Sequence, residues 1–380
     1  MKKIKVGIAG LGFIGPAHIE ALRRIPGIEV VAVSETSAEL AKDKALQLGI
    51  AKHHGSFENL LKENIDCVHI CTPNNLHFKM AKAALLAGKH VVCEKPLATT
   101  VDEGKELLEL AKEKGLVHAV HFNIRYYPMV RQMKVMREKG ELGEIYSIIG
   151  SYLQDWLFHT TDYNWRLEPE LSGKSKAVAD IGSHLMDLLE YISGVKITEV
   201  MADFNTIHPV RKKPLKPVET FTGKMLKPED YKEVPISTED YATVLLRFDN
   251  GNKGVITVSQ VNAGRKNRLS LEISGSKQTF NWCSERPNEM WMGNRNEPNQ
   301  VLMRDPSLFE KESAALISFP GGHNEGFPDT SKQMFKEVYD NIRKATMEGA
   351  TFPTFDAGLR ELILCDRILE SNEKQLWVKV

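Results

Sequence analysis

The chain has 380 residues, of which 42% are hydrophobic, and its 50 basic and 50 acidic side chains give a formal net charge of zero at pH 7. This length exceeds the usual size of one compact core, so we expect two domains, or one domain with a large insertion. The balanced charge supplies no long-range attraction to nucleic acid, an anionic membrane or a polyanionic substrate, so we expect a small-molecule partner, no nucleic acid and no membrane.

Cysteine usage and the first residues of the chain bear on its compartment. The five cysteines are an odd number and three of them lie in apolar runs, which argues against a disulfide framework and favours a reducing compartment. The first residues turn directly into a strand pattern, without the apolar core or cleavage site of a signal peptide. No run approaches the roughly 18 apolar residues of a membrane span. These features predict a cytoplasmic protein.

Short apolar runs alternate with helix-like segments over the first third of the chain. The runs predict strands at residues 5–9, 29–33, 66–71 and 90–93. Helical spacing of apolar residues lies between them, at residues 18–24, 37–47, 57–61 and 78–86. This alternation predicts parallel βαβ units and hence an α/β Rossmann domain, which we assign to residues 1–124. The loops after the strands, expected at the ligand-binding edge of the sheet, begin at Gly10, Ser34, Thr72 and Glu94.

The spacing of apolar residues changes after about residue 122. Alternating patterns typical of strands lie at residues 145–154, 198–205, 241–248, 253–261, 269–274 and 279–283. Hairpin signals lie at residues 249–252 and 275–276, and helical patterns at residues 179–192, 330–347 and 356–370. We therefore expect residues 125–380 to form an α+β domain for substrate binding and oligomerisation, with a large, mostly antiparallel open sheet. Residues 209–235, rich in proline and lysine, are expected to form a surface excursion.

The first turn of the chain carries three glycines. Gly10, Gly12 and Gly15, with Phe13 and Ile14 between the last two, follow a predicted strand and precede a predicted helix. In a dinucleotide-binding turn the first glycine permits the tight turn, the second lets pyrophosphate approach the backbone, and the third allows close packing of helix on strand. Three glycines alone also fit an ordinary turn, but the flanking elements favour a dinucleotide site whose pyrophosphate meets the helix N–H groups.

Glu35 stands at the end of the next predicted strand, 20 residues beyond Gly15. A carboxylate there can accept hydrogen bonds from the adenosine ribose hydroxyls, whereas a 2′-phosphate would face its negative charge. The following residues 36–39 supply no cation. The sequence therefore favours NAD over NADP, although a solvated glutamate at a strand end has the same pattern.

Two polar turns follow later strands. They are Thr72-Pro73-Asn74, continued by Asn75 and His77, and Glu94-Lys95-Pro96. Together with the glycine turn and residues 87–91, they resemble the glucose–fructose oxidoreductase, inositol dehydrogenase and MocA-type (Gfo/Idh/MocA) family. The resemblance spans nearly the whole chain. It implies an NAD cofactor and a carbohydrate or polyol substrate.

Lys95 follows a glutamate at a strand end, a pattern typical of a surface ion pair. The resemblance implies a different role, because in the family this lysine sits beside the nicotinamide and binds the substrate hydroxyl. Its ammonium would lower the pKa of that hydroxyl and stabilise the developing alkoxide. Glu94 is then its neighbour near the cofactor.

Asp180 and His184 belong to a segment that reads Asp-Ile-Gly-Ser-His-Leu-Met-Asp and ends at Asp187. Residues four apart point to one face of a helix. Histidine titrates near neutral pH and can take the proton that a hydroxyl loses on oxidation. An N-cap aspartate followed by a half-buried histidine has the same pattern. The segment resembles the family's catalytic Asp-x-Gly-x-His-x-x-Asp motif, which implies that Asp180 and His184 are catalytic and that Asp187 is a supporting partner.

A third cluster combines aromatic and amide side chains. Strand alternation predicts Tyr152, Gln154 and Trp156 on one face, which offers a sugar a stacking plane and an amide. A sheet face covered by helices would show the same pattern. The Leu-Gln-Asp-Trp stretch and the pair Trp165-Arg166 also resemble the branch of the family that contains levoglucosan dehydrogenase and other enzymes that oxidise the C3 hydroxyl of glucosides.

Two further segments are candidates for the site. The predicted domain crossover, which resembles the family's Asn-x-Arg-x-x-Pro segment, contains His121, Asn123, Arg125 and Tyr126. Crossovers line interdomain clefts, although a plain linker is equally consistent. A glycine-rich loop at residues 321–326 precedes a helix and either sends His323 into the substrate cleft or is only a turn.

The expected site residues fall into three sets. The catalytic residues are Lys95, Asp180 and His184. The cofactor-binding residues are Gly10, Gly12, Phe13, Ile14, Gly15, Glu35, Thr72, Pro73, Asn74, Asn75, His77, Glu94, Lys95, Asn123, Trp165 and Arg166. The substrate-binding residues are Lys95, Tyr126, Gln154, Trp156, Asp180, His184 and His323. The histidine pairs at 53 and 54 and at 118 and 121 lack a convincing third ligand, so we expect no metal.

We therefore expect an NAD-dependent oxidoreductase that converts a secondary hydroxyl of a sugar, glycoside or cyclic polyol to a ketone. Alternatives are an inositol dehydrogenase and an NAD-dependent glycosidase that oxidises its substrate transiently. A non-catalytic NAD-binding regulator is a third, but it should lack Lys95, Asp180 and His184, which this chain has. The resemblance also implies a homodimer or homotetramer, because the open sheet often serves as a dimer face in the family.

Overall fold

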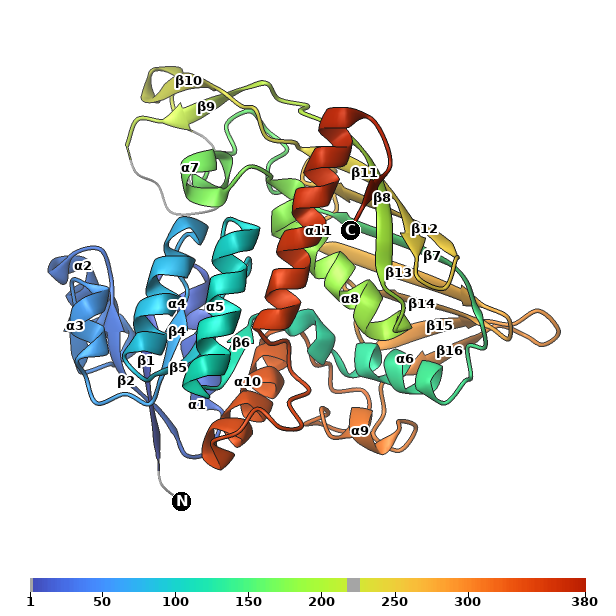
Figure 1. The fold of residues 1–380 in the computed structure, drawn as a ribbon, viewed down its shortest axis with the longest axis horizontal. Helices are drawn as coiled ribbons and strands as arrows, with labels where there is room; N and C mark the ends of the chain where they lie inside the picture. Colours follow the sequence, from blue (N-terminus) through green and yellow to red (C-terminus); the bar gives the residue numbers. More distant parts are fainter. Residues whose placement is uncertain (1–2, 217–225) are drawn as a thin grey trace. The chain divides into compact units, whose positions relative to one another are not determined.

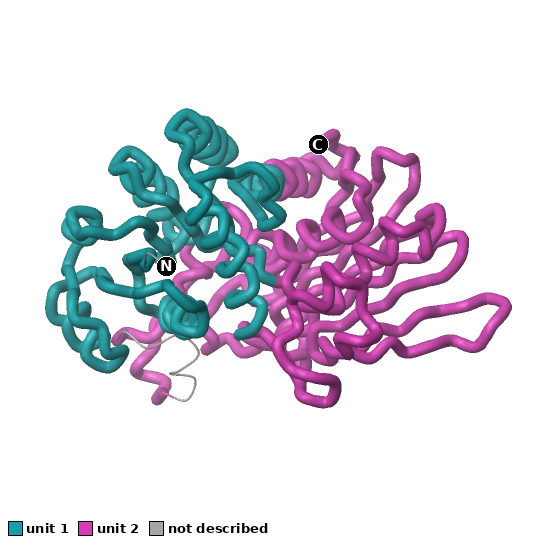
Figure 2. Tube along the Cα trace, turned by 90° about the horizontal axis from the view of Figure 1, so that it is seen from below, with its two compact units in different colours: residues 1–123, 170–173, 328–362 teal, residues 124–169, 174–327, 363–380 magenta. Residues whose placement is uncertain are grey.

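The structure is a computed structural model that describes residues 3–216 and 226–380. The chain divides into two compact units, coloured separately in Figure 2. Unit 1 contains residues up to 123, 170–173 and 328–362, and unit 2 contains residues 124–169, 174–327 and 363–380. The first change of unit, between residues 123 and 124, lies one residue before the predicted domain boundary, and the chain returns to unit 1 at residues 170–173 and 328–362.

Unit 1 is built on a parallel sheet with the strand order β3-β2-β1-β4-β5-β6 (Figure 1). Its strands in the described residues are β1 (Ile4–Ala9), β2 (Ile28–Ser34), β3 (Lys52–His54), β4 (Cys67–Ile70), β5 (His90–Cys93) and β6 (His118–Val120). All paired neighbours run parallel. The predicted Rossmann fold is confirmed. The strand order reverses between β1 and β4, and a doubly wound sheet binds a dinucleotide across this point, at the carboxyl ends of its strands.

The helices of unit 1 begin and end for local reasons. They are α1 (Ile14–Arg23), α2 (Ala38–Leu48), α3 (Phe57–Leu61), α4 (His77–Leu86), α5 (Val101–Lys114) and α10 (Phe327–Lys344). Ser37, Ser56 and Thr100 precede α2, α3 and α5, and each hydroxyl oxygen accepts a hydrogen bond from a first-turn N–H. Gly49 and Gly115 end α2 and α5 with positive φ. Of the helices in the described part of the chain, none is long and apolar enough to cross a membrane.

The inner strands of the parallel sheet are apolar because helices cover them. All four residues of β4 are buried, and Val68 and Ile70 pack with apolar side chains of α4 and α5. His69 interrupts this run and is completely buried. A polar side chain in such a strand must find hydrogen-bond partners inside the unit.

Unit 2 is built on a mixed sheet with the order β16-β15-β14-β13-β7-β12-β11-β8-β17. Within the described residues its strands are β7 (Ile145–Leu153), β8 (Ile197–Asn205), β11 (Tyr241–Phe248), β12 (Lys253–Ser259), β13 (Arg268–Gly275), β14 (Thr279–Cys283), β15 (Glu289–Gly293), β16 (Gln300–Met303) and β17 (Val378–Lys379). β7 and β12 run parallel and the other paired neighbours run antiparallel. Both predicted hairpins are present, and the mostly antiparallel sheet is confirmed.

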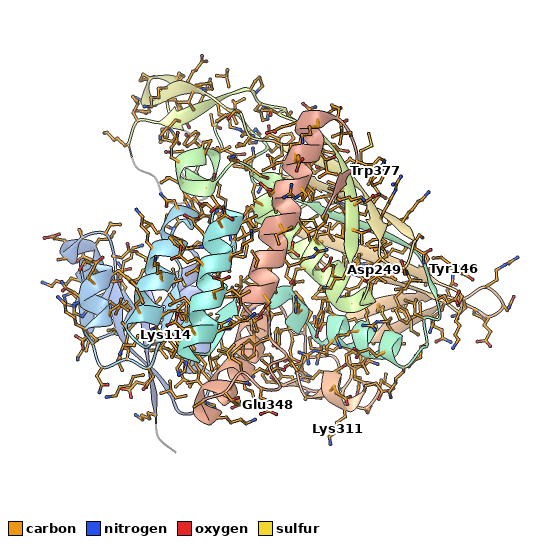
Figure 3. The ribbon with its side chains drawn as sticks, in the orientation of Figure 1. Lys114, Tyr146, Asp249, Lys311, Glu348 and Trp377 are labelled. Atoms are coloured by element: carbon orange, nitrogen blue, oxygen red, sulfur yellow. The ribbon has the colours of Figure 1, made fainter. Side chains whose placement is uncertain are left out.

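One face of the mixed sheet is covered by helices and the other is open. The apolar sides of α6 (Pro128–Glu138), α8 (Ser183–Ser193) and α11 (Phe355–Lys374) contribute to the core on the covered face. On the open face, a row of paired residues crosses the sheet, and its members Ile149, Leu245 and Val301 are 52%, 44% and 55% exposed. Tyr146, labelled in Figure 3, is also exposed on β7. Ile149 and Leu245 point away from the core because alternate strand residues face opposite sides, and their chain neighbours Ile148 and Leu246 are buried.

The proline-rich stretch at residues 209–235 contains a pairing that the sequence did not predict. β9 (Val210–Pro214) pairs antiparallel with β10 (Tyr231–Pro235). Proline stands at the last position of each strand, where a missing N–H disturbs the ladder least. The part of the predicted excursion at residues 217–225 lies outside the described residues.

Candidate active site

The turn between β1 and α1 has the geometry that its glycines predict. Gly10 has a φ of +86°, and a Cβ there would lie 2.7 Å from the Cys71 carbonyl oxygen. A Cβ on Gly15 would overlap the Gly10 carbonyl oxygen. A Cβ on Gly12 would meet no atom of the described residues within 4 Å. Packing therefore requires Gly10 and Gly15, whereas Gly12 leaves the backbone open to a ligand.

The N-terminus of α1 suits an anion. The helix begins at Ile14, and the preceding Phe13 has no side-chain oxygen that could cap it. First-turn N–H groups lack partners within a helix and carry a partial positive charge. This end of α1 therefore fits the pyrophosphate of a dinucleotide.

Glu35 lies directly after β2 and bonds to the glycine turn. Its Oε1 accepts a hydrogen bond from the Leu11 N–H at 2.6 Å, and its Oε2 accepts one from the Thr36 N–H at 3.2 Å. On the same turn, Lys44 of α2 donates to the Leu11 carbonyl at 2.6 Å. The carboxylate is thus fixed where an adenosine ribose is expected. The sequence did not predict this contact of Lys44, because Lys44 lies beyond residues 36–39, which directly follow Glu35 and contain no cation.

The turn after β4 is tied to its surroundings by side chains. Pro73 precedes a short 3-10 helix at Asn74–Leu76, and the Asn74 amide donates to the Ser172 carbonyl at 2.9 Å. His77 is completely buried, with Nδ1 2.6 Å from the Pro96 carbonyl oxygen and Nε2 2.9 Å from that of Thr72. The His77 ring therefore links the turn after β4 to the turn after β5 through contacts with one backbone carbonyl oxygen of each.

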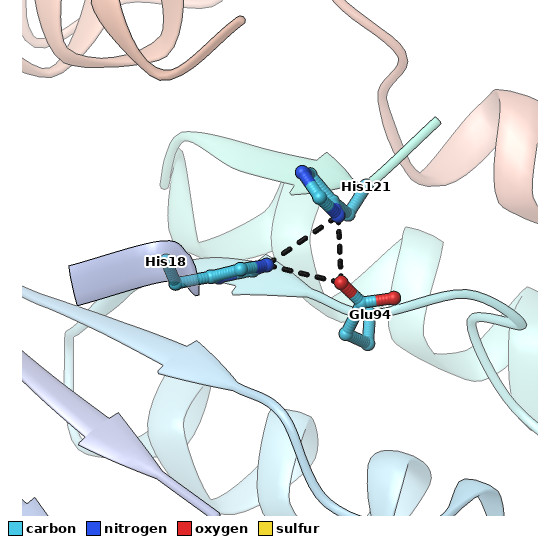
Figure 4. Close-up of side chains that lie close together, drawn as sticks. All are labelled: His18, Glu94 and His121. Carbon is cyan, nitrogen blue, oxygen red and sulfur yellow. Dashed lines mark hydrogen bonds and ion pairs between the residues drawn. The ribbon is translucent and has the colours of Figure 1, made fainter. Parts of the chain in front are cut away.

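Glu94 follows β5 and is 8% exposed. Its Oε1 lies 2.6 Å from His121 Nδ1 and 3.0 Å from His18 Nε2 (Figure 4), and its Oε2 accepts the Lys95 backbone N–H at 3.2 Å. Burial raises the pKa of Glu94, but its interactions with His121 and His18 outweigh burial and hold the pKa well below its usual range. The carboxylate is therefore ionised, and Lys95, which is partly exposed, stands beside it in the chain.

Asp180 is fixed from two sides in unit 2. Its Oδ1 accepts Arg166 Nε at 3.2 Å and its Oδ2 accepts Gln260 Nε2 at 3.0 Å. The residue lies in a π-helical turn at Val178–Gly182 that leads into α8. The expectation of continuous α-helical spacing from Asp180 to His184 was therefore wrong, since a π turn is wider than an α turn. Both side chains are half-buried.

His184, in the first turn of α8, lies near Tyr152 of β7, which belongs to the predicted cluster of aromatic and amide side chains. The ring of Tyr152 is 6.5 Å from that of His184, centroid to centroid. Asn267 Oδ1 accepts the Tyr152 hydroxyl at 2.9 Å and Gln154 Nε2 at 2.7 Å. Tyr152 and Gln154 do share a direction, but both are buried and engaged with Asn267, which sequence inspection missed.

Trp156 departs from the predicted pattern. β7 ends at Leu153, and Trp156 lies in a turn beyond it, so strand alternation does not place Trp156 with Gln154. Residues Trp165–Leu167 form a 3-10 helix in which the Arg166 guanidinium stacks 4.6 Å from the centre of the Trp165 ring. Arg166 thus connects an aromatic plane to Asp180.

The other candidates have varied environments. Asn123 is buried and donates to Thr330 Oγ1 at 2.7 Å, and Tyr126 is buried with the Arg131 guanidinium 5.3 Å from its ring centre. Asp187 accepts Arg125 Nε at 2.7 Å, which fits the supporting role expected of it. His323 is exposed on its loop.

A buried ionic cluster precedes the π turn. The Lys176 ammonium pairs with Asp240 Oδ1, which also accepts Arg211 Nη2 at 2.7 Å, and all three side chains are completely buried. Neighbouring Glu239 accepts the backbone N–H groups of Lys176 and Val178 at 3.0 and 2.9 Å. The cluster anchors the backbone that leads to Asp180. No local pattern predicts this cluster, because its members lie on distant segments of the chain.

One group of side chains has donors that could hold a metal ion. His18, Glu94 and His121 offer ligand atoms within 4.8 Å of one another. The expectation of no metal stays a prediction. Of these three residues, the sequence indicated only His121 as a possible metal ligand, because His18 lies on α1, more than a hundred positions away from it in the chain.

The glycine turn, the carboxylate after β2 and the strand order define a dinucleotide-dependent protein, and the Asp180 and His184 segment adds groups suited to proton transfer. The profile described as "Oxidoreductase family, NAD-binding Rossmann fold" matches residues 4–122, and that of the GFO/IDH/MocA C-terminal domain matches residues 130–281. The chain belongs to the Gfo/Idh/MocA family of NAD-dependent oxidoreductases.

Relatives cover the chain from end to end. Levoglucosan dehydrogenase of Pseudarthrobacter phenanthrenivorans is 30% identical, over 100% of this chain and 99% of its own length. Myo-inositol 2-dehydrogenase of Thermotoga maritima is 27% identical, over 72% and 73%. A levoglucosan dehydrogenase structure with NADH and levoglucosan has a TM-score of 0.88 at 28% identity and covers 100% and 99% of the two chains. An inositol dehydrogenase homologue from Azotobacter vinelandii with NAD⁺ has a TM-score of 0.87 at 25% identity, covering 100% and 98%.

Proposed function

We propose that this enzyme oxidises a secondary hydroxyl of a sugar, glycoside or cyclic polyol to a ketone and passes the hydride to NAD⁺. The observation that carries the proposal is the carboxylate of Asp180, held by Arg166 and Gln260 just before the turn that bears His184. Polar groups fixed in this way suit a substrate with several hydroxyls. The solved relative with NADH and levoglucosan supports the same substrate class.

The chemistry divides between cofactor and protein. Bound NAD⁺ supplies the hydride acceptor. His184 takes the proton of the reacting hydroxyl, because an imidazole is a base near neutral pH. The Lys95 ammonium stabilises the alkoxide that develops when that proton leaves. Asp180 orients a neighbouring hydroxyl, or the His184 ring, through its fixed carboxylate.

The cofactor-binding assignments follow from unit 1. Gly12 and the first turn of α1 bind the pyrophosphate, and Glu35 binds the adenosine ribose. The turns after β4 and β5 border the nicotinamide half. Their side chains Asn74 and Glu94 are already fixed by hydrogen bonds.

Substitution of Lys95 by Ala tests the assignment. We expect turnover to fall below about one-thousandth of wild type while the equilibrium affinity for NAD⁺ stays within a few-fold, because the lost charge acts on the developing alkoxide. The measurements are NADH absorbance and calorimetric titration of NAD⁺. Lys105→Ala, at an exposed lysine of α5, is the matched control. Full activity in Lys95→Ala would refute the role.

The substrate is identified by a screen for NADH formation over inositols, free hexoses, levoglucosan and glucosides, with NAD⁺ and NADP⁺ in parallel. The levoglucosan dehydrogenase relatives favour levoglucosan. The C3 hydroxyl of levoglucosan or of a glucoside is the position that the sequence resemblance implies. The inositol dehydrogenase homologue favours inositol as the second candidate. Release of free sugar from a glycoside without NADH would instead identify a glycosidase.

We further propose a homodimer or homotetramer formed through the open face of the mixed sheet. Leu245, Val255 and Ile149 support this, because they are paired neighbours on three strands and form an apolar stretch on this face, and contiguous apolar surface marks contact sites. Light scattering of the double variant Ile149→Glu, Leu245→Glu should give the mass of a monomer. The predicted cytoplasmic location is tested by fractionation of the source cells.

A further inference from the structure

Beside Glu94, unit 1 contains a connected set of buried polar side chains. His18 Nδ1 lies 2.9 Å from His69 Nδ1, and His69 Nε2 lies 2.8 Å from the Tyr339 hydroxyl. His121 Nε2 lies 3.0 Å from the Ser331 hydroxyl. With the two contacts to Glu94 shown in Figure 4, every ring nitrogen of the three histidines has a partner.

The protons of this network can be placed from Glu94. Its ionised carboxylate can only accept, so His18 donates from Nε2 and His121 donates from Nδ1. A neutral His18 then accepts at Nδ1 the proton of His69 Nδ1, and a neutral His69 accepts the Tyr339 hydroxyl at Nε2. Two hydrogen bonds from the histidines therefore hold the carboxylate in place.

The directions in which the pKa values of these residues are shifted agree with this placement of the protons. Burial lowers the pKa of His18 to about 4 and lowers that of His69 well below its usual range. The pKa of Glu94 is also held well below its usual range, by His121 and His18 against the effect of burial. His18 and His69 are therefore neutral at neutral pH, and Glu94 carries a negative charge.

The position of Glu94 decides what this charge acts on. The carboxyl ends of the strands form one edge of the parallel sheet, and the strand order divides this edge into two halves. One half lies over β1, β2 and β3, where Glu35 is expected to bind the adenosine. The other half lies over β4, β5 and β6. Glu94 directly follows β5, so it belongs to the half that takes the other nucleotide. In that nucleotide, the oxidised nicotinamide ring is a cation and the reduced ring is neutral. A carboxylate with 8% exposure is screened little by solvent.

We infer that the buried carboxylate of Glu94, held in place by His18 and His121, selectively stabilises NAD⁺ over NADH and so lowers the reduction potential of the bound cofactor. Glu94 is the group that acts on the cofactor, and His18 and His121 are positioning residues. The reaction removes a hydride from the substrate carbon and a proton from its hydroxyl, so the ring loses its positive charge while Glu94 keeps its negative one. The inference rests on the proposed placement of the nicotinamide half over β4 to β6.

The test is the ratio of two equilibrium dissociation constants, for NAD⁺ and for NADH, measured by calorimetry and by NADH fluorescence without substrate. In Glu94→Gln the ratio of the NAD⁺ constant to the NADH constant should rise about tenfold, which raises the potential of the bound couple by about 30 mV. Glu94→Asp keeps the charge and should hold the ratio within about twofold. Glu109→Gln, at an exposed glutamate of α5, is the surface control and should leave the ratio unchanged.

The positioning residues give a second measurement. His121→Asn removes one of the two donors to Oε1 and should raise the ratio about threefold, with His18→Asn in the same direction, because Glu94 is then less firmly ionised. Thermal unfolding of each variant reports folding separately, and His121→Asn carries the test if Glu94→Gln does not fold.

Three results would overturn the inference. One is an unchanged ratio in a folded Glu94→Gln or His121→Asn protein. Another is an equal shift in Glu94→Asp and Glu94→Gln, which would assign the effect to shape. The third is a stoichiometric metal ion, detected by elemental analysis of the purified protein, because it would replace the proton network. Because no substrate is present, these outcomes are independent of the Lys95→Ala test of the proposed function.

Discussion

The two units each contain a buried polar cluster, and the two clusters differ in how their charges are arranged. The cluster of unit 1 joins His121 and the neutral rings of His18 and His69 to a single ionised carboxylate, Glu94. The cluster of unit 2 sets the cations Lys176 and Arg211 against the carboxylate of Asp240, with Glu239 beside it. In unit 2 the charges compensate one another, so the cluster suits an anchor. In unit 1 histidine rings surround a single buried carboxylate, and within the described residues no buried lysine or arginine is bonded to it, so the cluster suits an electrostatic role toward a ligand.

The largest effect on the free energy of unfolding is expected from Asp240→Asn, in the cluster of unit 2. Removal of this charge leaves Lys176 and Arg211 buried without their carboxylate, which should destabilise unit 2 by about 3–5 kcal/mol. All five tryptophans lie in unit 2, so their fluorescence during urea unfolding reports this unit.

The control for this experiment is Asp203→Asn, at an exposed position of β8, with an expected change within about 0.5 kcal/mol. An Asp240→Asn protein as stable as wild type would show that the ionic cluster of unit 2 is not an anchor.

A smaller effect is expected in unit 1 at the glycine turn, where structure and ligand binding can be separated. Gly10→Ala places a Cβ 2.7 Å from the Cys71 carbonyl oxygen at positive φ, and should cost about 2 kcal/mol or more. Gly12→Ala meets no neighbour and should change stability by less than about 0.5 kcal/mol, while NAD⁺ affinity falls at least about tenfold. Hydrogen exchange of β1 peptides and calorimetric titration of NAD⁺ are the measurements. Equal losses of stability in the two variants would contradict the assignment of Gly10 to packing and of Gly12 to ligand binding.

The smallest effect, when it is measured for each pH unit, is the acid response of the buried histidine His118 in unit 1. Burial lowers the pKa of His118 to about 4, and its Nδ1 accepts the Phe355 N–H at 3.1 Å. Between about pH 6.5 and pH 4 the unfolded chain binds a proton at this residue and the folded chain does not, so stability falls as pH falls through this window. The expected slope is at most about 1.4 kcal/mol per pH unit for each such histidine.

His118→Gln should remove one proton from this dependence and flatten the slope of unit 1 stability between pH 6.5 and pH 4. Hydrogen exchange of β6 peptides at several pH values measures it. His208→Gln, at a surface histidine of unit 2, is the control. An unchanged slope in His118→Gln would place the acid sensitivity elsewhere.

Much of the fold could be predicted from local pattern. β1, the glycine turn and α1 are contiguous, so the strand pattern, the Gly10 and Gly15 spacing and the helical pattern are all present in one short stretch. The hairpin between β11 and β12 was predicted for the same reason. β3 and β6 were missed because strands of three residues are too short to show alternation.

The candidate site could be predicted only in part. Single positions such as Glu35, Lys95, Asp180 and His184 were named from motifs, because each motif is a local arrangement. Their partners were not. Gln260, which holds Asp180, is 80 positions away in the chain, and no local pattern links them.

The sequence by itself therefore determined the class of protein, since the dinucleotide turn, the polar strand ends and the Asp180 to His184 segment are local in the chain. Only the tertiary structure decided the electrostatics. His18 meets Glu94 across 76 positions and His69 across 51, and His121 meets Glu94 across 27. A lone histidine in an apolar run gives no indication of its partner. Whether it is neutral or charged, and what it holds in place, depends on which groups folding buries beside it.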